Sequence, residues 1–273
     1  MSKDKLDLAD IALQVRIGLI KMLNAAGSGH SGGSLSAVDI LVSLYFQEMR
    51  VDPLQPDMPE RDRFVLSKGH AAPALYAVLA ERGYWAKENL LTLRKIGSPL
   101  QGHPDRLKLA GVDASTGSLG QGFSWAAGMA LAGKIDQAGY RVYALLGDGE
   151  LEEGIVWEAA MAAAHYRLDN LVAIIDNNGL QIDGRVEDVM GVEPIAAKFE
   201  AFGWTVATVN GHDYNELSAG FAKARSVKGK PTAIIADTIK GKGCSFMENR
   251  VEWHGAAPNQ EETERALREM ELG

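Results

Sequence analysis

The chain has 273 residues, 46% of them hydrophobic, which is enough to bury one sizeable core. Its 28 basic residues against 36 acidic ones leave a formal net charge of −8, which argues against a general binder of nucleic acid. A single cysteine, Cys244, excludes an intrachain disulfide, and we recognise neither a signal peptide nor an apolar run of membrane-spanning length. We therefore expect a cytoplasmic protein without membrane contact.

Hydrophobic periodicity predicts strands that alternate with helices along the chain. We expect helices over residues 8–26, 71–83, 119–138, 153–166, 194–202, 213–226 and 261–270, and strands over residues 64–66, 141–146, 171–175, 205–209 and 232–237. A further helix, capped by Ser34 or Ser36, should follow the glycine-rich stretch around His30. This alternation is typical of an α/β fold with a mostly parallel sheet flanked by helices, and we interpret residues 1–273 as a single domain.

The stretch from Gly147 to Asn178 carries the clearest functional signal. Asp148 lies between two glycines at the end of one predicted strand, and Asn178 follows the end of the next. If these strands are parallel neighbours, the carboxylate and the amide oxygen lie side by side at one edge of the sheet. Hard oxygen ligands suit Mg²⁺ or Ca²⁺ together with phosphate oxygens, and the glycines allow a diphosphate to approach the backbone. The alternative is that Gly-Asp-Gly is only a turn.

The segments GDGELEEGIVWEA and DNNGLQIDG resemble the thiamine diphosphate fingerprint of the transketolase family. The resemblance extends from residue 8 to about residue 258 and implies a thiamine diphosphate-binding domain of the PP-type, which holds the diphosphate. It implies that Mg²⁺ or Ca²⁺ is bound by Asp148, Asn178 and the carbonyl of Leu180. The cofactor-binding residues that it implies are His70, Gly117, Ser118, Leu119, Gly149, Glu153, Asn178, Ile182, Lys240 and His254.

Four of the six histidines lie in further segments that resemble transketolase loops: GSGHSGG, SKGHAAP, QGHPD and EWHG. The resemblance implies that His30, His103 and His254 are catalytic, because they would position sugar hydroxyls and transfer protons. A histidine beside a glycine is otherwise usually a loop residue that bonds the backbone. We expect that ordinary role for His212, which precedes a helix capped by Asp213, and a core position for His165.

Two lysines, Lys68 and Lys240, lie in glycine-containing segments that could bring positive charge to a diphosphate. In the family, Lys240 matches a lysine on the diphosphate, whereas Lys68 could equally be a solvated side chain.

The transketolase family also needs a pyrimidine-binding domain and a C-terminal domain, and neither lies in the matched region. The resemblance therefore implies that the partner is a C-terminal transketolase subunit, in an α₂β₂ heterotetramer, with Glu153 partly buried against it. The expected reaction is transfer of a two-carbon ketol unit from a ketose (phosphate) to an aldose (phosphate), as in pentose phosphate metabolism. The alternatives are the α-type subunit of another split thiamine diphosphate enzyme, such as a 2-oxo acid dehydrogenase, and a regulatory module without catalysis.

Overall fold

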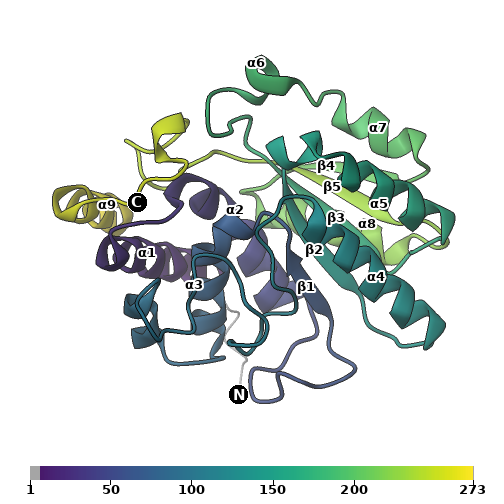
Figure 1. Cartoon of the computed structure of the whole chain (residues 1–273), viewed down its shortest axis with the longest axis horizontal. Helices are drawn as coiled ribbons and strands as arrows, with labels where there is room; N and C mark the ends of the chain where they lie inside the picture. Colours follow the sequence, from purple (N-terminus) through teal and green to yellow (C-terminus); the bar gives the residue numbers. More distant parts are fainter. Residues whose placement is uncertain (1–6, 273) are drawn as a thin grey trace.

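A five-stranded parallel sheet organises residues 7–272, the part of the chain that this computed structural model describes (Figure 1). Its strand order is β1-β2-β3-β5-β4. The strands are β1 (Arg63–Leu66), β2 (Val142–Gly147), β3 (Leu171–Asn177), β4 (Thr205–Asn210) and β5 (Thr232–Asp237), and every pairing is parallel. The predicted fold class is confirmed, and each predicted strand is present within two residues of its expected ends.

Helices cover both faces of this sheet (Figure 1). They are α1 (Leu8–Ala26), α2 (Ser31–Ser43), α3 (Ala72–Arg82), α4 (Gln121–Ile135), α5 (Gly154–His165), α6 (Val186–Met190), α7 (Ile195–Ala201), α8 (Tyr214–Ser226) and α9 (Gln260–Leu272). Alternate residues of β2 enter two separate cores, because successive side chains of a strand point to opposite faces. Tyr143 and Leu145 pack with residues of α1, α2, α3 and α8, whereas Ala144 packs with residues of α4, α5 and α7.

The second helix begins earlier than the sequence predicted. α2 starts at Ser31 with His30 as its N-cap, so Ser34 and Ser36 lie inside the helix and do not cap it. A tertiary partner explains the second serine, because Ser36 Oγ donates a hydrogen bond of 2.6 Å to Asp176 Oδ2 at the end of β3. Residues 31–33 of the glycine-rich segment therefore form the first turn of a buried helix whose beginning lies against the end of β3, and the N-cap His30 lies at the same edge.

The long segment predicted over residues 97–118 is irregular, and its last residues lie against the end of β1. Thr116 Oγ1 donates to the Leu66 carbonyl oxygen at 2.7 Å. A Cβ on Gly69 would lie 2.8 Å from the backbone nitrogen of Gly117, so only glycine fits where these two segments cross. The close crossing brings the loop that contains His103 to the carboxyl end of the sheet.

One prediction in the βαβ unit was wrong. His165, expected in the core, is exposed on α5, and its ring contacts that of Tyr166. The buried residues of α5 are Val156, Ala159, Ala160 and Ala163. Within residues 7–272 no helix combines the length and the apolar character needed to cross a membrane.

Candidate active site

The two strand ends singled out by the sequence lie next to each other. β2 and β3 are parallel neighbours, with Gly147 opposite Asp176. The carboxylate of Asp148 accepts a hydrogen bond of 2.8 Å from the Gly149 nitrogen and one of 2.5 Å from the Gly179 nitrogen. The loop that carries Asn178 is thus bonded directly to Asp148.

The oxygen atoms at this edge form a set that suits a hard cation. Asn178 Oδ1 accepts a hydrogen bond of 3.2 Å from the Leu180 nitrogen, and the Leu180 carbonyl accepts one of 2.9 Å from Lys240 Nζ. Asp148 is 3% exposed, and burial followed by the charge of Asp176 raises the pKa of its carboxyl to about 6. Within residues 7–272 no three His, Cys, Asp or Glu side chains form a metal site, so a cation here would need amide, carbonyl and ligand oxygens.

Two buried ammonium groups face the same edge, but only one has a counter-ion. Lys68 Nζ forms an ion pair of 2.5 Å with Asp176 Oδ2. Lys240 is 1% exposed, and no described carboxylate lies within salt-bridge distance of its Nζ. Burial, and then the charge of Lys68, lowers the pKa of Lys240 to about 8. An unpaired buried cation of this kind fits a site that receives an anion.

Four imidazole rings lie close to one another at this site. The ring centroid of His30 lies 5.3 Å from that of His70, 5.5 Å from that of His254 and 6.5 Å from that of His103. Burial lowers the pKa of all four, to about 4 for His30 and about 3 for His254. The charge of Arg94 lowers the pKa of His30 and His103 further. All four rings therefore favour the neutral form at pH 7, in which one ring nitrogen donates a hydrogen bond and the other accepts one.

The tautomer of one ring follows from its partner. Lys240 Nζ lies 2.9 Å from His254 Nδ1, and an ammonium can only donate, so Nδ1 is the acceptor and Nε2 carries the proton. His30 Nδ1 is buried without a partner among the described residues. The His30 ring nevertheless lines the cavity at this edge of the sheet.

These groups surround a cavity of about 210 Å³ at the carboxyl edge of the sheet. The predicted site residues that line it are His30, His70, Gly117, Leu119, Asp148, Gly149, Asn178, Leu180, Ile182, Lys240 and His254. Three predicted residues do not line it. Ser118 is an exposed neighbour of two lining residues, Glu153 is exposed at the N-cap of α5, and His103 is exposed beside His30. Complete pockets for small ligands usually measure roughly 300–1,000 Å³, so this cavity is small for a whole cofactor.

Two functional features were missed from the sequence. Glu150 lines the cavity and is 2% exposed, and its carboxylate accepts hydrogen bonds from Ser67 Oγ, the Gly120 nitrogen and the Gly147 nitrogen. Glu150 therefore links three separate segments of the site by hydrogen bonds. Its position directly after the Gly-Asp-Gly turn was a signal that could have found it. The second feature is Asp176, the buried counter-ion of Lys68, which lies near the end of β3, two residues before the predicted Asn178.

Comparison with known proteins gives a consistent result. The family model for the transketolase thiamine diphosphate binding domain matches residues 9–273. The chain is 45% identical to the 6-deoxy-6-sulfo-D-fructose transketolase subunit SqwG of Clostridium sp. (strain MSTE9), over 99% of this chain and 98% of that relative. It is also 45% identical to one subunit of the apulose-4-phosphate transketolase of Phocaeicola vulgatus, over 92% of this chain and 89% of that relative.

A solved structure agrees with the fold. The crystal structure of transketolase from Campylobacter jejuni superposes with a TM-score of 0.92 at 36% sequence identity. The match covers 97% of this chain but only 42% of that one, so the chain spans less than half of a full-length transketolase. The chain belongs to the transketolase family, and it is the family's thiamine diphosphate-binding domain.

Proposed function

We propose that this chain, a subunit of a split transketolase, binds the diphosphate end of thiamine diphosphate together with a divalent metal ion. The observation that carries the proposal is a pair of buried charges on one cavity, Asp148 and Lys240. Each is almost fully buried, and neither has an oppositely charged partner within salt-bridge distance among residues 7–272. A divalent cation would satisfy the carboxylate, and a diphosphate would satisfy the ammonium.

The metal would be Mg²⁺ or Ca²⁺, held by the side chains of Asp148 and Asn178 and the carbonyl of Leu180. Because Lys240 Nζ now donates to that carbonyl, metal binding would require the ammonium to share or release it. Lys240 would then turn its donors to the diphosphate. The remaining cofactor contacts would come from the lining residues His70, Gly117, Leu119, Gly149, Ile182 and His254, with Ser118 beside them.

When bound, thiamine diphosphate supplies a carbon nucleophile and an electron sink for cleaving the bond next to a ketose carbonyl. The chain contributes neutral imidazoles around that reaction. His30 and His254 both line the cavity, and His254 has a proton on Nε2. With His103 they would hold sugar hydroxyls and move protons to and from them.

A partner subunit would complete the site. The chain corresponds in length to subunits of two transketolases and to 42% of a full-length enzyme, and its cavity is small for the whole cofactor. We propose that a C-terminal transketolase subunit supplies the pyrimidine pocket, in an α₂β₂ heterotetramer. The exposed Glu153 would then lie against that partner. Residues 1–273 would thus be one domain of a composite enzyme.

The donor substrate would be a ketose that ends in an anionic group. One relative is named for 6-deoxy-6-sulfo-D-fructose and another for apulose 4-phosphate, and both sugars carry such a group. The acceptor would be an aldose or its phosphate. Sugar phosphates of pentose phosphate metabolism belong to the same chemical class.

The test is reconstitution with the neighbouring gene product that carries the pyrimidine-binding domain, in the presence of thiamine diphosphate and Mg²⁺. Ketol transfer would be assayed from 6-deoxy-6-sulfo-D-fructose, apulose 4-phosphate and xylulose 5-phosphate. The proposal predicts transfer from at least one donor, and only with both subunits. Transfer by this chain alone would refute the composite site, whereas decarboxylation of 2-oxo acids in place of transfer would favour a 2-oxo acid dehydrogenase subunit.

A further inference from the structure

The turn that follows β5, residues 238–243, presents Lys240 to the cavity. The turn has irregular backbone, so its position depends on tertiary contacts. The Gly241 nitrogen donates to the Gly32 carbonyl at 3.0 Å, and Thr238 Oγ1 donates to Asp176 Oδ1. These contacts hold the two flanks of Lys240 against α2 and β3.

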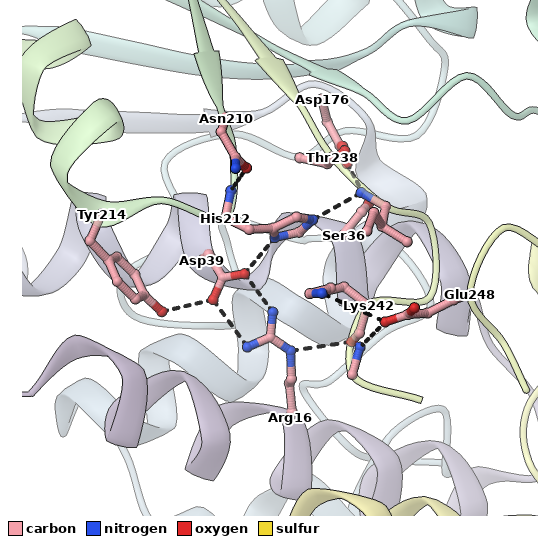
Figure 2. Close-up of polar contacts among 12 residues, drawn as sticks. Arg16, Ser36, Asp39, Asp176, Asn210, His212, Tyr214, Thr238, Lys242 and Glu248 are labelled. Carbon is pink, nitrogen blue, oxygen red and sulfur yellow. Dashed lines mark hydrogen bonds and ion pairs between the residues drawn. The ribbon is translucent and has the colours of Figure 1, made fainter. Parts of the chain in front are cut away.

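A second set of contacts comes from a buried carboxylate that lines no part of the cavity. Asp39 on α2 accepts hydrogen bonds from three side chains, which lie on α1, on the loop between β4 and α8, and at the start of α8 (Figure 2). Arg16 binds it in a bidentate pair at 2.6 and 3.0 Å, His212 Nδ1 lies 2.6 Å away, and Tyr214 Oη donates at 2.7 Å. Burial alone would raise the pKa of Asp39, but the hydrogen bond from His212 and the charge of Arg16 outweigh it and hold the pKa below its usual range.

Two of these three partners also bind the turn. His212 Nε2 accepts a hydrogen bond of 2.9 Å from the Ile239 nitrogen, and Arg16 Nε donates one of 3.3 Å to the Lys242 carbonyl. The two backbone groups lie immediately before Lys240 and two residues after it. Asp39 therefore orients two side chains that bind the main chain on both sides of Lys240.

The carboxylate also fixes which nitrogen of His212 accepts. Ionised Asp39 can only accept, so Nδ1 must carry the proton that it shares with Asp39. Nε2 is then left with a lone pair, which is what the Ile239 N–H requires. A side chain without this arrangement of donor and acceptor could not bind both groups at once.

We propose that Asp39, acting through His212 and Arg16, positions Lys240 for the diphosphate, and that all three are positioning residues for cofactor binding. This inference rests on the proposed function, because Lys240 must receive an anion. A buried ionic cluster is a poor source of stability, since apolar residues of similar volume often serve as well or better. The cluster instead fixes one geometry of the turn.

The test compares two amides at position 212 in the assembled two-subunit enzyme. His212→Gln can place an acceptor where Nε2 lies, whereas His212→Asn reaches only the position of Nδ1 and can still donate to Asp39. Tyr214→Phe is the matched control, because it removes one hydrogen bond to Asp39 and leaves both contacts to the turn intact. Binding of thiamine diphosphate with Mg²⁺ would be measured by titration calorimetry, and exchange of the Ile239 amide hydrogen by mass spectrometry without cofactor.

We expect His212→Asn to weaken thiamine diphosphate binding by about three- to tenfold, as for a lost hydrogen bond, and to speed exchange at Ile239. His212→Gln should restore both only in part, because it regains the acceptor for the Ile239 nitrogen but not the donor to Asp39. Tyr214→Phe should change neither. In a Lys240→Met background, His212→Asn should cause no further loss of affinity.

Unchanged affinity in His212→Asn, together with weakened binding in Lys240→Met, would overturn this inference and leave the proposed function standing. Unchanged affinity in Lys240→Met would instead refute the anion-binding role on which both rest. The inference would also be refuted if the Ile239 amide exchanged as fast in His212→Gln as in His212→Asn.

Discussion

Replacing Lys240 by methionine removes a buried positive charge and keeps much of the side-chain volume. Two of its three N–H donors are directed to the Leu180 carbonyl and His254 Nδ1, each at 2.9 Å. The charge and the third donor are free for an anion. A charge-assisted hydrogen bond contributes about 1.5–3 kcal/mol, so thiamine diphosphate should bind about 10- to 150-fold more weakly to the assembled Lys240→Met enzyme.

The same substitution should not weaken the cofactor-free chain. The pKa of Lys240, about 8 against 10.5, corresponds to about 3 kcal/mol against the charged form in the folded state. Loss of two hydrogen bonds removes about 2 kcal/mol of stability, so we expect a net gain of about 1 kcal/mol in the free energy of unfolding.

Calorimetric titration with thiamine diphosphate and Mg²⁺, and urea unfolding without them, would measure the two effects of Lys240→Met. Lys242→Met is the matched control, because Lys242 lies in the same turn but is partly exposed and faces Glu248 at 3.8 Å. A change of less than threefold in affinity would refute the anion-binding role of Lys240. A loss of several kcal/mol in the free energy of unfolding would instead refute the expected gain in stability.

Three further predictions concern the histidines and Glu150. The pKa of His30 is about 4 when folded and 6.5 in the ordinary state, so the unfolded chain binds more protons between these values and stability falls as pH drops through them. His30→Gln should reduce that fall, and urea unfolding of both proteins at pH 4.5, 5.5 and 7 would measure it. Equal dependence of the free energy of unfolding on pH in the two proteins would contradict the prediction. Burial, and then the charge of Arg94, lowers the pKa of His103, so Arg94→Gln should raise that pKa. NMR titration of the His103 ring measures the change, and an unchanged pKa would contradict the prediction. Glu150→Ala leaves three buried donors without an acceptor and should lower the free energy of unfolding by at least about 2 kcal/mol. A loss of less than about 1 kcal/mol, measured by urea unfolding, would contradict this prediction.

Much of the fold could be predicted because its strands are short, continuous apolar runs. Residues 171–175 are fully buried on both faces of the sheet, as such runs are in parallel sheets. α1 was predicted at both ends, because Asp7 caps its first turn and Gly27 ends it with a left-handed φ of 62°. The start of α2 was wrong because a tertiary partner of Ser36, Asp176, outweighs the local capping preference of serine.

The site was predicted less completely, since sequence identifies residue types but not their tertiary partners. Position after a strand was enough to select Asp148 and Asn178. His212 was expected to be an ordinary loop residue, and its neighbour Asp213 does cap α8. Its contact with Asp39 joins residues 173 positions apart, and no local pattern indicates such a pair.

The most direct test of the account is a crystal structure of the two-subunit assembly with thiamine diphosphate and Mn²⁺, in which anomalous scattering locates the metal. We predict a metal peak within about 2.0–2.3 Å of oxygens from Asp148, Asn178 and Leu180, with the diphosphate beside Lys240. A metal bound elsewhere, or a diphosphate out of reach of Lys240, would contradict it.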